Sequence, residues 1–446
     1  MTSKTINYCF TEVVICLFMA ALLLSTLPSH AANIHVNALP NAVGCDLIDA
    51  ILSANNNSSI GGCTSGSVGI DTITFAPEIS QYEFMLEIGT SRSVTPVIDS
   101  EIEIIGPENG LLSFTQSSVL SRFFLVGVDG DLSLENISLQ GGGATTGGAI
   151  RVNGKLSLNN VEIVGSTASF GAGLWVVGGE AIIRNSLFRN NNSLNQGGGI
   201  GISNASRVTI YDSSFSGNSA DEYGGGISLA AAPESELFMY NTTITENTAG
   251  ISGGGVSLFF DIPAGQTEGN SAVIRNSIIS GNTAPDFSEV FFTNQSLAIN
   301  LDIRNNLLGT NSSTYSESVN SLIFLSSDTN NIIATPFFEN TPLRSILGGL
   351  SDNGGQTMTH ALVENSPAID NGLPFYVTLV VFLPIFEPGC RGELAAFSAG
   401  EYRTDQRNID RPIGAECDIG AFEYQPTEES CYVAKAKNNN VFTFCL

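Results

Sequence analysis

Arginine and aromatic residues recur at one point of a repeating pattern, where they could bind a sugar polymer. They stand directly before a recurring Asn or Asp, except for Phe238, which lies two residues further back: Arg184, Tyr211, Phe238, Tyr240, Arg275 and Arg304. Guanidinium groups bind carboxylates through paired hydrogen bonds, and aromatic rings stack on apolar faces. An outward column of these residues predicts a contact site for a glycan or a protein. The alternative is that they stack on one another only to cover a sheet.

Acids and bases that could cleave a polysaccharide do not converge in the sequence. A hydrolase needs two or three carboxylates about 5 to 9.5 Å apart, and a lyase needs a Lys or Arg base near a cation-neutralised uronate. The repeated region has one lysine, Lys155, and its acids Asp212 and Asp221-Glu222 fall at different points of the repeat. We therefore assign no catalytic residue and interpret Asp212 as a substitute for Asn.

Acidic loops near the C-terminal end offer oxygen ligands for calcium. The candidate metal ligands are Asp352, Asp405 and Asp410. The sequence has no EF-hand pattern, and its Gly clusters do not form a nucleotide-binding fingerprint. A structural Ca²⁺ is thus the only cofactor considered, and none is assigned.

The elements that must position these residues follow from a repeat of 24 to 35 residues, a period typical of solenoids. Apolar residues stand two and four positions before each anchor, as in a strand with one buried face, and the apolar phase shifts by one after it. We expect a bend between two strands at each anchor, the anchors being Asn136, Asn160, Asn185, Asp212, Asn241, Asn276 and Asn305.

A second amide column follows six residues after the anchors, at Asn191, Asn218, Asn247, Asn282 and Asn311. Glycine clusters such as 197–199 and 224–226 come next, and glycine adopts the positive φ of a tight corner. Stacked Asn amides can bond from coil to coil. Two or three short strands per repeat with Asn and Gly corners predict an all-β fold, a right-handed parallel β-helix with a cap at each end.

Two other repeat folds fit less well. A leucine-rich horseshoe needs a helical segment that the Gly-Gly-Gly corners exclude. A β-propeller needs a blade-sized repeat with its own signature, which the sequence lacks.

Composition narrows the partners. The 446 residues carry a formal charge of −26, yet only 13% of them are charged. This balance opposes binding to nucleic acid and leaves neutral glycans, cationic partners or metal ions. Hydrophobic residues make up 42% of the chain, which argues against disorder.

The first 31 residues predict export. Lys4 precedes an apolar run over residues 13–27, and Ser29-His30-Ala31 suits a signal peptidase, so residues 1–31 are interpreted as a signal peptide and no later span is expected. Six cysteines then remain, and an oxidising destination favours disulfides over zinc. They allow 15 pairings, among which proximity favours three: Cys45–Cys63, Cys390–Cys417 and Cys431–Cys445.

Motifs at both ends resemble a known family. Residues 45–50 read CDLIDA, and the C-terminal part contains LSDNGGQTMTHAL at 350–362, TDQRNIDRP at 404–412 and CDIGAFE at 417–423. Together they resemble bacterial exported β-helix proteins that combine an N-terminal CSLREA domain, coils like those of polymorphic outer-membrane proteins and a C-terminal choice-of-anchor Q domain. Ile48-Asp49 stands where the family has Arg-Glu, and Asn408 where it usually has Gly. The resemblance implies a β-helix at the cell surface or secreted, without a general activity.

We therefore expect five regions: signal peptide 1–31, N-terminal cap 32–100, coils 101–345, C-terminal cap 346–424 and a disulfide-closed tail hairpin 425–446. The expected function is a non-enzymatic adhesin or glycan-binding scaffold, whose partner is an extracellular polysaccharide or a surface protein. Two alternatives stay open: a polysaccharide lyase or glycoside hydrolase, and a purely structural surface protein.

Overall fold

The computed structural model describes most of the chain that follows the predicted signal peptide. Residues 1–30, Asn311 and Cys390 lie outside the described part. The described residues are 31–40, 42–84, 92–116, 121–230, 234–259, 270–293, 300–309, 330–333, 343–373, 375–380, 383–388, 404–414, 416–426, 431–435 and 441–445.

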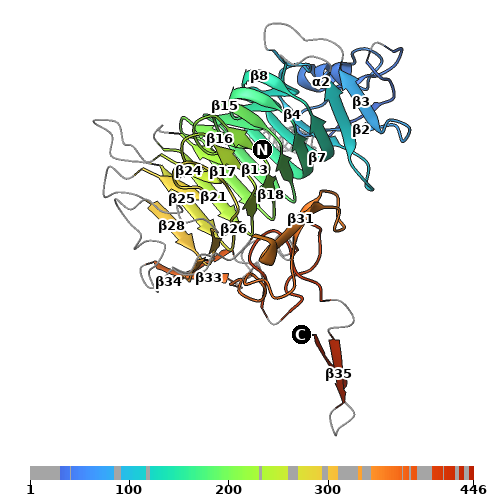
Figure 1. Ribbon diagram of the computed structural model, residues 1–446. Helices are drawn as coiled ribbons and strands as arrows, with labels where there is room; N and C mark the ends of the chain where they lie inside the picture. Colours follow the sequence, from blue (N-terminus) through green and yellow to red (C-terminus); the bar gives the residue numbers. More distant parts are fainter. Residues whose placement is uncertain are drawn as a thin grey trace, which may run out of the picture.

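Short parallel strands stack in successive coils (Figure 1). Their apolar residues alternate inward, so that Leu156, Leu158 and Ile183 are no more than 2% exposed. The strands that precede or include the anchors are β7 (Asp131–Gln140), β10 (Lys155–Val164), β13 (Glu180–Arg184), β17 (Arg207–Tyr211), β21 (Glu236–Tyr240), β25 (Ser271–Arg275) and β28 (Asn300–Arg304). β4 (Glu101–Ile105) pairs with β7 in the same sheet.

Each anchor turns the chain with a positive φ of 44° to 57°. Asn adopts this conformation more readily than most residues, which is why it recurs there. The strands after the bend are β14 (Leu187–Arg189), β18 (Ser214–Ser216), β22 (Thr243–Thr245), β26 (Ile278–Ile279) and β29 (Leu307–Leu308). β5 (Leu112–Gln116) pairs with the second half of β7, and β30 (Ile332–Ile333) pairs with β29.

Two further parallel sheets complete the coils. One contains β8 (Gly143–Thr146), β11 (Thr167–Phe170), β15 (Asn192–Gln196), β19 (Ser219–Ala220) and β23 (Thr248–Ala249). The other, which we call the third sheet, contains β6 (Phe124–Val126), β9 (Ile150–Val152), β12 (Leu174–Val177), β16 (Ile200–Ser203), β20 (Ile227–Leu229), β24 (Val256–Leu258) and β27 (Val290–Phe292).

A glycine corner leads into the third sheet. Gly171 has φ +57°, and a Cβ there would lie 2.3 Å from the carbonyl oxygen of Leu174. Both the backbone conformation and the lack of space therefore require glycine. The parallel pairing throughout the coils confirms the predicted parallel β-helix.

A buried chain of amides runs from coil to coil beneath these corners. Each Nδ2 donates to the Oδ1 of the Asn in the next coil, from Asn191 to Asn218, from Asn218 to Asn247 and from Asn247 to Asn282, each at 2.9 Å. All four side chains are fully buried. The Nδ2 of Asn282, the last Asn of the chain, donates to a carboxylate oxygen of Glu289 at 2.7 Å. The chain satisfies inward-facing polar groups that would otherwise be costly to bury.

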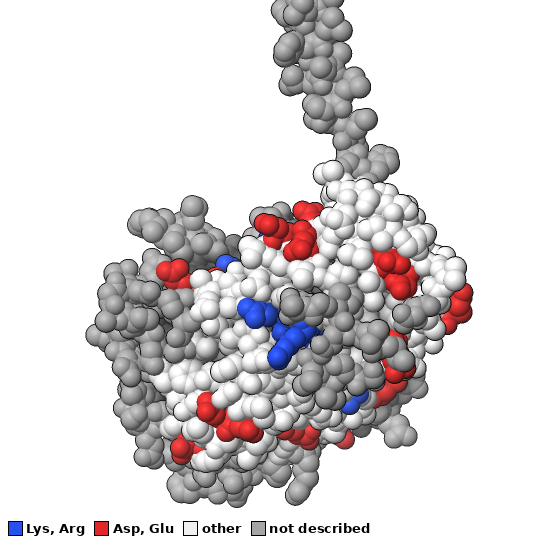
Figure 2. All heavy atoms as spheres, turned by 90° about the horizontal axis from the view of Figure 1, so that it is seen from above, with Lys and Arg blue, Asp and Glu red and all other residues white. Residues whose placement is uncertain are grey.

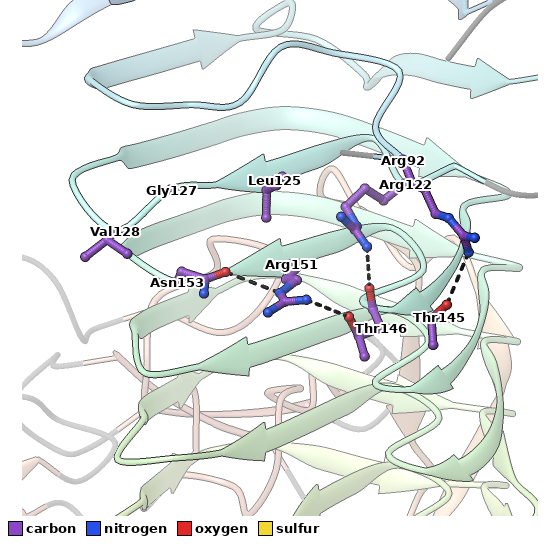
Figure 3. Close-up of a pocket in the computed structure, with 9 residues that line it drawn as sticks. All are labelled: Arg92, Arg122, Leu125, Gly127, Val128, Thr145, Thr146, Arg151 and Asn153. Carbon is purple, nitrogen blue, oxygen red and sulfur yellow. Dashed lines mark hydrogen bonds between the residues drawn. The ribbon is translucent and has the colours of Figure 1, made fainter. Parts of the chain in front are cut away.

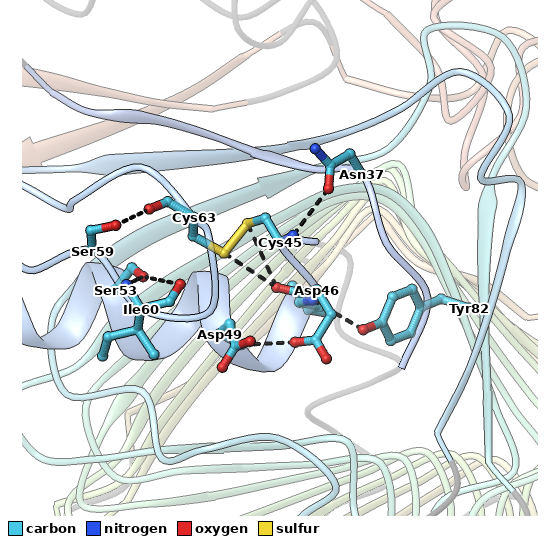
Figure 4. Close-up of a disulfide and its surroundings, with 10 residues drawn as sticks. Asn37, Cys45, Asp46, Asp49, Ser53, Ser59, Ile60, Cys63 and Tyr82 are labelled. Atoms are coloured by element: carbon cyan, nitrogen blue, oxygen red, sulfur yellow. Dashed lines mark hydrogen bonds between the residues drawn. A yellow bond between two sulfur atoms is a disulfide. The ribbon is translucent and has the colours of Figure 1, made fainter. Parts of the chain in front are cut away.

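A small N-terminal unit covers the first coil. It contains β1 (Asn33–Val36), α2 (Leu47–Asn56), β2 (Asp71–Phe75) and β3 (Gln81–Phe84). The carboxylate of Asp46 caps α2 by accepting the N–H of Asp49 at 2.9 Å, and the Cys45–Cys63 disulfide ties the helix start to the following loop (Figure 4). Burial and the charge of Asp46 raise the pKa of Asp49.

The C-terminal part returns along the coils (Figure 1). It contains η2 (Leu343–Ser345), the hairpin β31 (Leu347–Ser351) with β32 (Thr359–Leu362), and the hairpin β33 (Phe375–Val380) with β34 (Leu383–Pro388). We call residues 343–373 and 404–426 the C-terminal strap. Gln356 of the strap bonds the backbone of Glu108 and Gly110, and Asn371 bonds Asn305 at the other end of the coils.

The tail forms the hairpin β35 (Cys431–Lys435) with β36 (Val441–Cys445), in which Cys431 pairs with Cys445 in register. Cys417 is disulfide-bonded, and its predicted partner Cys390 lies outside the described residues. Among the residues described, no helix is both long and apolar enough to cross a membrane.

Candidate functional site

The predicted Arg and aromatic column stands in register on successive strands. Arg184, Tyr211, Tyr240, Arg275 and Arg304 are Cα partners from β13 to β28. The guanidinium of Arg184 lies 5.2 Å from the ring centre of Tyr211, and the Tyr211 and Tyr240 rings stack at 5.3 Å. Phe238 lies one outward position away, beneath the guanidinium of Arg207 at 4.7 Å.

Two members of this column are not open to a ligand, which corrects the expectation of an exposed row. Tyr240 is 8% exposed and Arg275 2% exposed. Arg275 forms an ion pair with Asp302, which also binds Arg304 at 2.6 Å. These contacts use the guanidinium groups internally, as the sheet-covering alternative requires. Arg304 is exposed, and Arg184, Tyr211 and Phe238 are half-buried. Ligand binding stays a prediction for these four residues.

The strap explains part of this burial because it docks on the anchors that follow the column. Asn408 accepts a hydrogen bond from Asn185 at 3.2 Å, and Leu373 accepts one from Asn276 at 3.0 Å. A guanidinium nitrogen of Arg411 lies 3.4 Å from the carboxylate of Asp212. Asp212 therefore holds the strap, and burial raises its pKa to about 7 despite that positive charge.

The other acid and base candidates lie in separate places. Lys155 is exposed at the start of β10, whereas Asp221 and Glu222 lie in the loop between β19 and β20. Asp212 is buried at its bend. The structure does not bring these groups to one substrate position.

The three candidate calcium ligands do not meet either. The carboxylate of Asp405 is occupied by Arg407, at 2.8 Å from its Nε, and by the N–H of Glu423 at 3.0 Å. Asp352 accepts the N–H of Gly354 within its own turn. Among the described residues, no cluster of three or more His, Cys, Asp or Glu side chains could hold a metal ion.

A cavity of about 570 Å³ opens elsewhere, beside the third sheet, and sequence reasoning missed it. Three arginines gather there, and we call the site the arginine cleft. It is lined by Arg92, Arg122, Leu125, Gly127, Val128, Thr145, Thr146, Arg151 and Asn153 (Figure 3).

Successive coils supply the three arginines. Ser93, next to Arg92, pairs in parallel with Arg122 of the following coil. Arg151 lies in the middle of β9 between two fully buried residues, Ile150 and Val152, so alternation turns it outward. The rigid stacking of the coils thus fixes the three side chains at one place.

Hydrogen bonds to a pair of threonines orient the guanidinium groups (Figure 3). Arg122 donates to the carbonyl oxygen of Thr146 at 3.0 Å, and Arg151 donates to the Thr146 hydroxyl at 3.2 Å. Arg92 donates to the Thr145 hydroxyl at 3.3 Å. Arg151 also donates to the amide oxygen of Asn153 at 3.3 Å. These contacts hold the groups in place before any ligand arrives.

The cleft is positively charged in an acidic protein. None of the nine described lining residues is Asp or Glu. Burial, and then the positive charges of Arg151 and Arg92, lower the pKa of Arg122 to about 10, so it stays protonated at neutral pH. Figure 2 shows basic atoms gathered near the middle of one face, with acidic atoms around them. Such a site attracts carboxylate or sulfate groups.

The residues that line the cleft suit the binding of an anionic ligand. The described lining holds no carboxylate pair for glycoside hydrolysis. A β-elimination requires a Lys or Arg base, and burial lowers the pKa of Arg122 to about 10. Arginine forks in a concave site can instead hold and orient an anionic ligand.

Residues 125–338 match the family model described as right handed beta helix region. The chain contains a right-handed parallel β-helix. The match begins within β6. Of the three cleft arginines it includes Arg151, whereas Arg92 and Arg122 precede it. No curated protein and no solved structure is significantly similar to the chain. The match to the family model and the parallel pairing of the strands together establish the β-helix.

Proposed function

We propose that the protein is an exported scaffold that binds an acidic polysaccharide through the arginine cleft without cleaving it. The observation that carries this proposal is the open cavity on which Arg92 and Arg151 converge beside Arg122, which is 5% exposed and adds its positive charge. Guanidinium forks match the geometry of carboxylate and sulfate groups. A concave site with a few oriented polar groups is the usual form of a ligand site.

Two features support an exported location for this proposal. A signal peptide at 1–31, as the sequence predicts, would direct the chain out of the cell, and the Cys45–Cys63 disulfide suits an oxidising environment. A binding scaffold at the surface or outside the cell would act as an adhesin or a matrix component.

Binding should depend on the cleft arginines and not on charge in general. We expect Arg151→Gln and Arg92→Gln each to weaken binding of polygalacturonate by about tenfold, because each removes a charge-assisted hydrogen bond donor. The measurement is isothermal titration of the purified protein at physiological salt. The matched control is Arg207→Gln, which removes the same charge from an exposed ion pair with Glu236 on β17.

The same samples distinguish a binder from an enzyme. Ultraviolet absorbance of unsaturated uronates would reveal a lyase, and new reducing ends would reveal a hydrolase. Binding that survives Arg207→Gln, is lost in Arg151→Gln and yields no cleavage products supports the proposal. Equal losses in Arg151→Gln and Arg207→Gln would contradict it.

A further inference from the structure

A column of residues leads from the arginine cleft along the coils. Its first member is Thr146, whose hydroxyl and carbonyl oxygens bind Arg151 and Arg122. From there the register runs through consecutive coils, in the order Thr146, Phe170, Gln196, Tyr223, Ser252 and Asp286. The column is therefore continuous with the cleft and parallel to the axis of the β-helix.

The middle of the column suits uncharged sugars. Phe170 and Tyr223 are half-buried, with Gln196 between them. Aromatic rings stack on the apolar faces of sugars, and an amide bonds their hydroxyl groups. Neighbouring coils are about 4.8 Å apart, so Thr146 and Tyr223 are separated by about 14 Å along the axis.

Packing holds both aromatic rings in place. Phe170 lies 5.6 Å from the ring of Trp175. Tyr223 stacks on Phe291 at 5.9 Å and meets the edge of Phe259 at 5.0 Å. Rings that are already ordered lose little conformational entropy when a ligand binds.

The far end of the column is acidic. Asp221 and Glu222 directly precede Tyr223, and Asp221 is exposed. Asp286 pairs with Ser252 further along and is also exposed. A negatively charged sugar on Tyr223 would be repelled, whereas one in the arginine cleft is attracted. The charge along the column thus changes sign over about 14 Å.

We infer that the ligand is a sparsely charged acidic polysaccharide, which places one charged sugar in the arginine cleft and uncharged sugars on Phe170 and Tyr223. This inference rests on the proposed function and specifies its ligand. A polymer with a carboxylate on every sugar could fill the cleft but would bring further charges toward Asp221 and Glu222. The repulsion selects for charge spacing as well as for charge sign.

The test compares oligosaccharides of equal length by isothermal titration at physiological salt. Hyaluronan carries a carboxylate on every second sugar, polygalacturonate on every sugar, and dextran on none. We expect hyaluronan to bind about tenfold more tightly than polygalacturonate, and dextran not to bind measurably. Polygalacturonate binding as tightly as hyaluronan would overturn the inference.

Two sets of variants locate the effect. Asp221→Asn combined with Glu222→Gln should strengthen polygalacturonate binding and reduce the difference between the two ligands to less than about threefold. Tyr223→Ala should weaken hyaluronan binding by about tenfold and leave the binding of free glucuronate unchanged. An unchanged preference in the surface acid variant, which alters no packed ring, would contradict the inference even if Tyr223→Ala proves unstable.

Failure of this inference is distinguishable from failure of the proposed function. Suppose that Arg151→Gln abolishes glucuronate binding while the variants at Asp221, Glu222 and Tyr223 leave oligosaccharide binding unchanged. The cleft then binds acids, and the residues from Phe170 to Tyr223 are not part of the site. If wild-type protein binds neither glucuronate nor any of the acidic oligosaccharides, both proposals are wrong.

Discussion

Asp212 occupies a position at which the other six anchors carry Asn. The substitution gives the strap a charged partner, Arg411, at the cost of burying a carboxylate that is 4% exposed. Burial raises the pKa of Asp212 to about 7, and burial together with Glu423 raises that of Asp418 to about 7. Both groups bind protons more tightly in the folded state than in the unfolded chain, where a carboxyl titrates near pH 4.

The sign of the pH dependence follows. Between about pH 4 and about pH 7 the folded state holds protons that the unfolded state has lost, so the free energy of unfolding falls as pH rises. We expect the melting temperature to fall across this window and to level off above about pH 8. Asp212→Asn should remove part of this slope, which thermal unfolding at a series of pH values measures.

His360 contributes a pH dependence of stability that is opposite in sign to that of Asp212. Burial lowers its pKa, and its ring bonds the Ser216 hydroxyl and the Gly348 carbonyl, each at 2.9 Å. A lowered histidine pKa adds stability that is lost as pH falls, which is the opposite sign. The difference between wild type and Asp212→Asn isolates the carboxyl. Identical slopes in the two proteins would contradict its assignment.

At the scale of the elements, the buried amide chain determines how one coil meets the next. Asn218 donates to the carbonyl of Phe188 and to Asn247, and its Oδ1 accepts from the backbone and side chain of Asn191. Removing the amide leaves several of these buried groups without partners. Each such group costs about 1 to 3 kcal/mol.

We therefore expect Asn218→Leu to lower the free energy of unfolding by about 3 kcal/mol or more. Urea unfolding followed by circular dichroism measures the change. The matched control is Asn192→Leu, an exposed Asn at the start of β15 that directly follows Asn191 of the amide chain. A loss no greater than that of the control would show that the amide chain is not a stabilising element.

The coils could be predicted from sequence because their signals are local and repeated. The anchors, the apolar alternation and the Gly corners recur within each period, and the structure has the expected bends at Asn160 and Asn276. The arginine cleft could not be found in this way. Arg92 and Arg122 precede the regular repeats, and only the stacking of coils brings them beside Arg151. The burial of Tyr240 and Arg275 was missed for a related reason, since the periodicity contains no information on where the strap docks.

At the scale of the whole molecule, the strap and the coils share a second hydrophobic core. It contains Ile278 and Leu307 from the coils and Ile346, Leu347, Leu362, Ala368, Ile419 and Phe422 from the strap. Ile419 is fully buried, whereas Ile413 of the same strap is 39% exposed. Substitutions in this core therefore test whether it holds the strap on the coils.

We expect Ile419→Ala to lower the free energy of unfolding by about 2 to 5 kcal/mol, because it leaves a cavity between strap and coils. Ile413→Ala should change it by less than about 0.5 kcal/mol. Limited proteolysis should cut Ile419→Ala within the strap faster than wild type. Equal cleavage rates in the two variants would show that this core does not hold the strap.

The path of the strap also affects how the chain reaches this structure. In a simple solenoid each repeat touches only its neighbours, so folding can spread from any coil and either end can fray alone. Here Gln356 bonds residues near Gly110, about 246 positions earlier in the chain. Contacts of such sequence separation close large loops and slow the final step of folding. A chain that folds during its synthesis can stack its coils early, but the fold is complete only after the strap has been made and has docked.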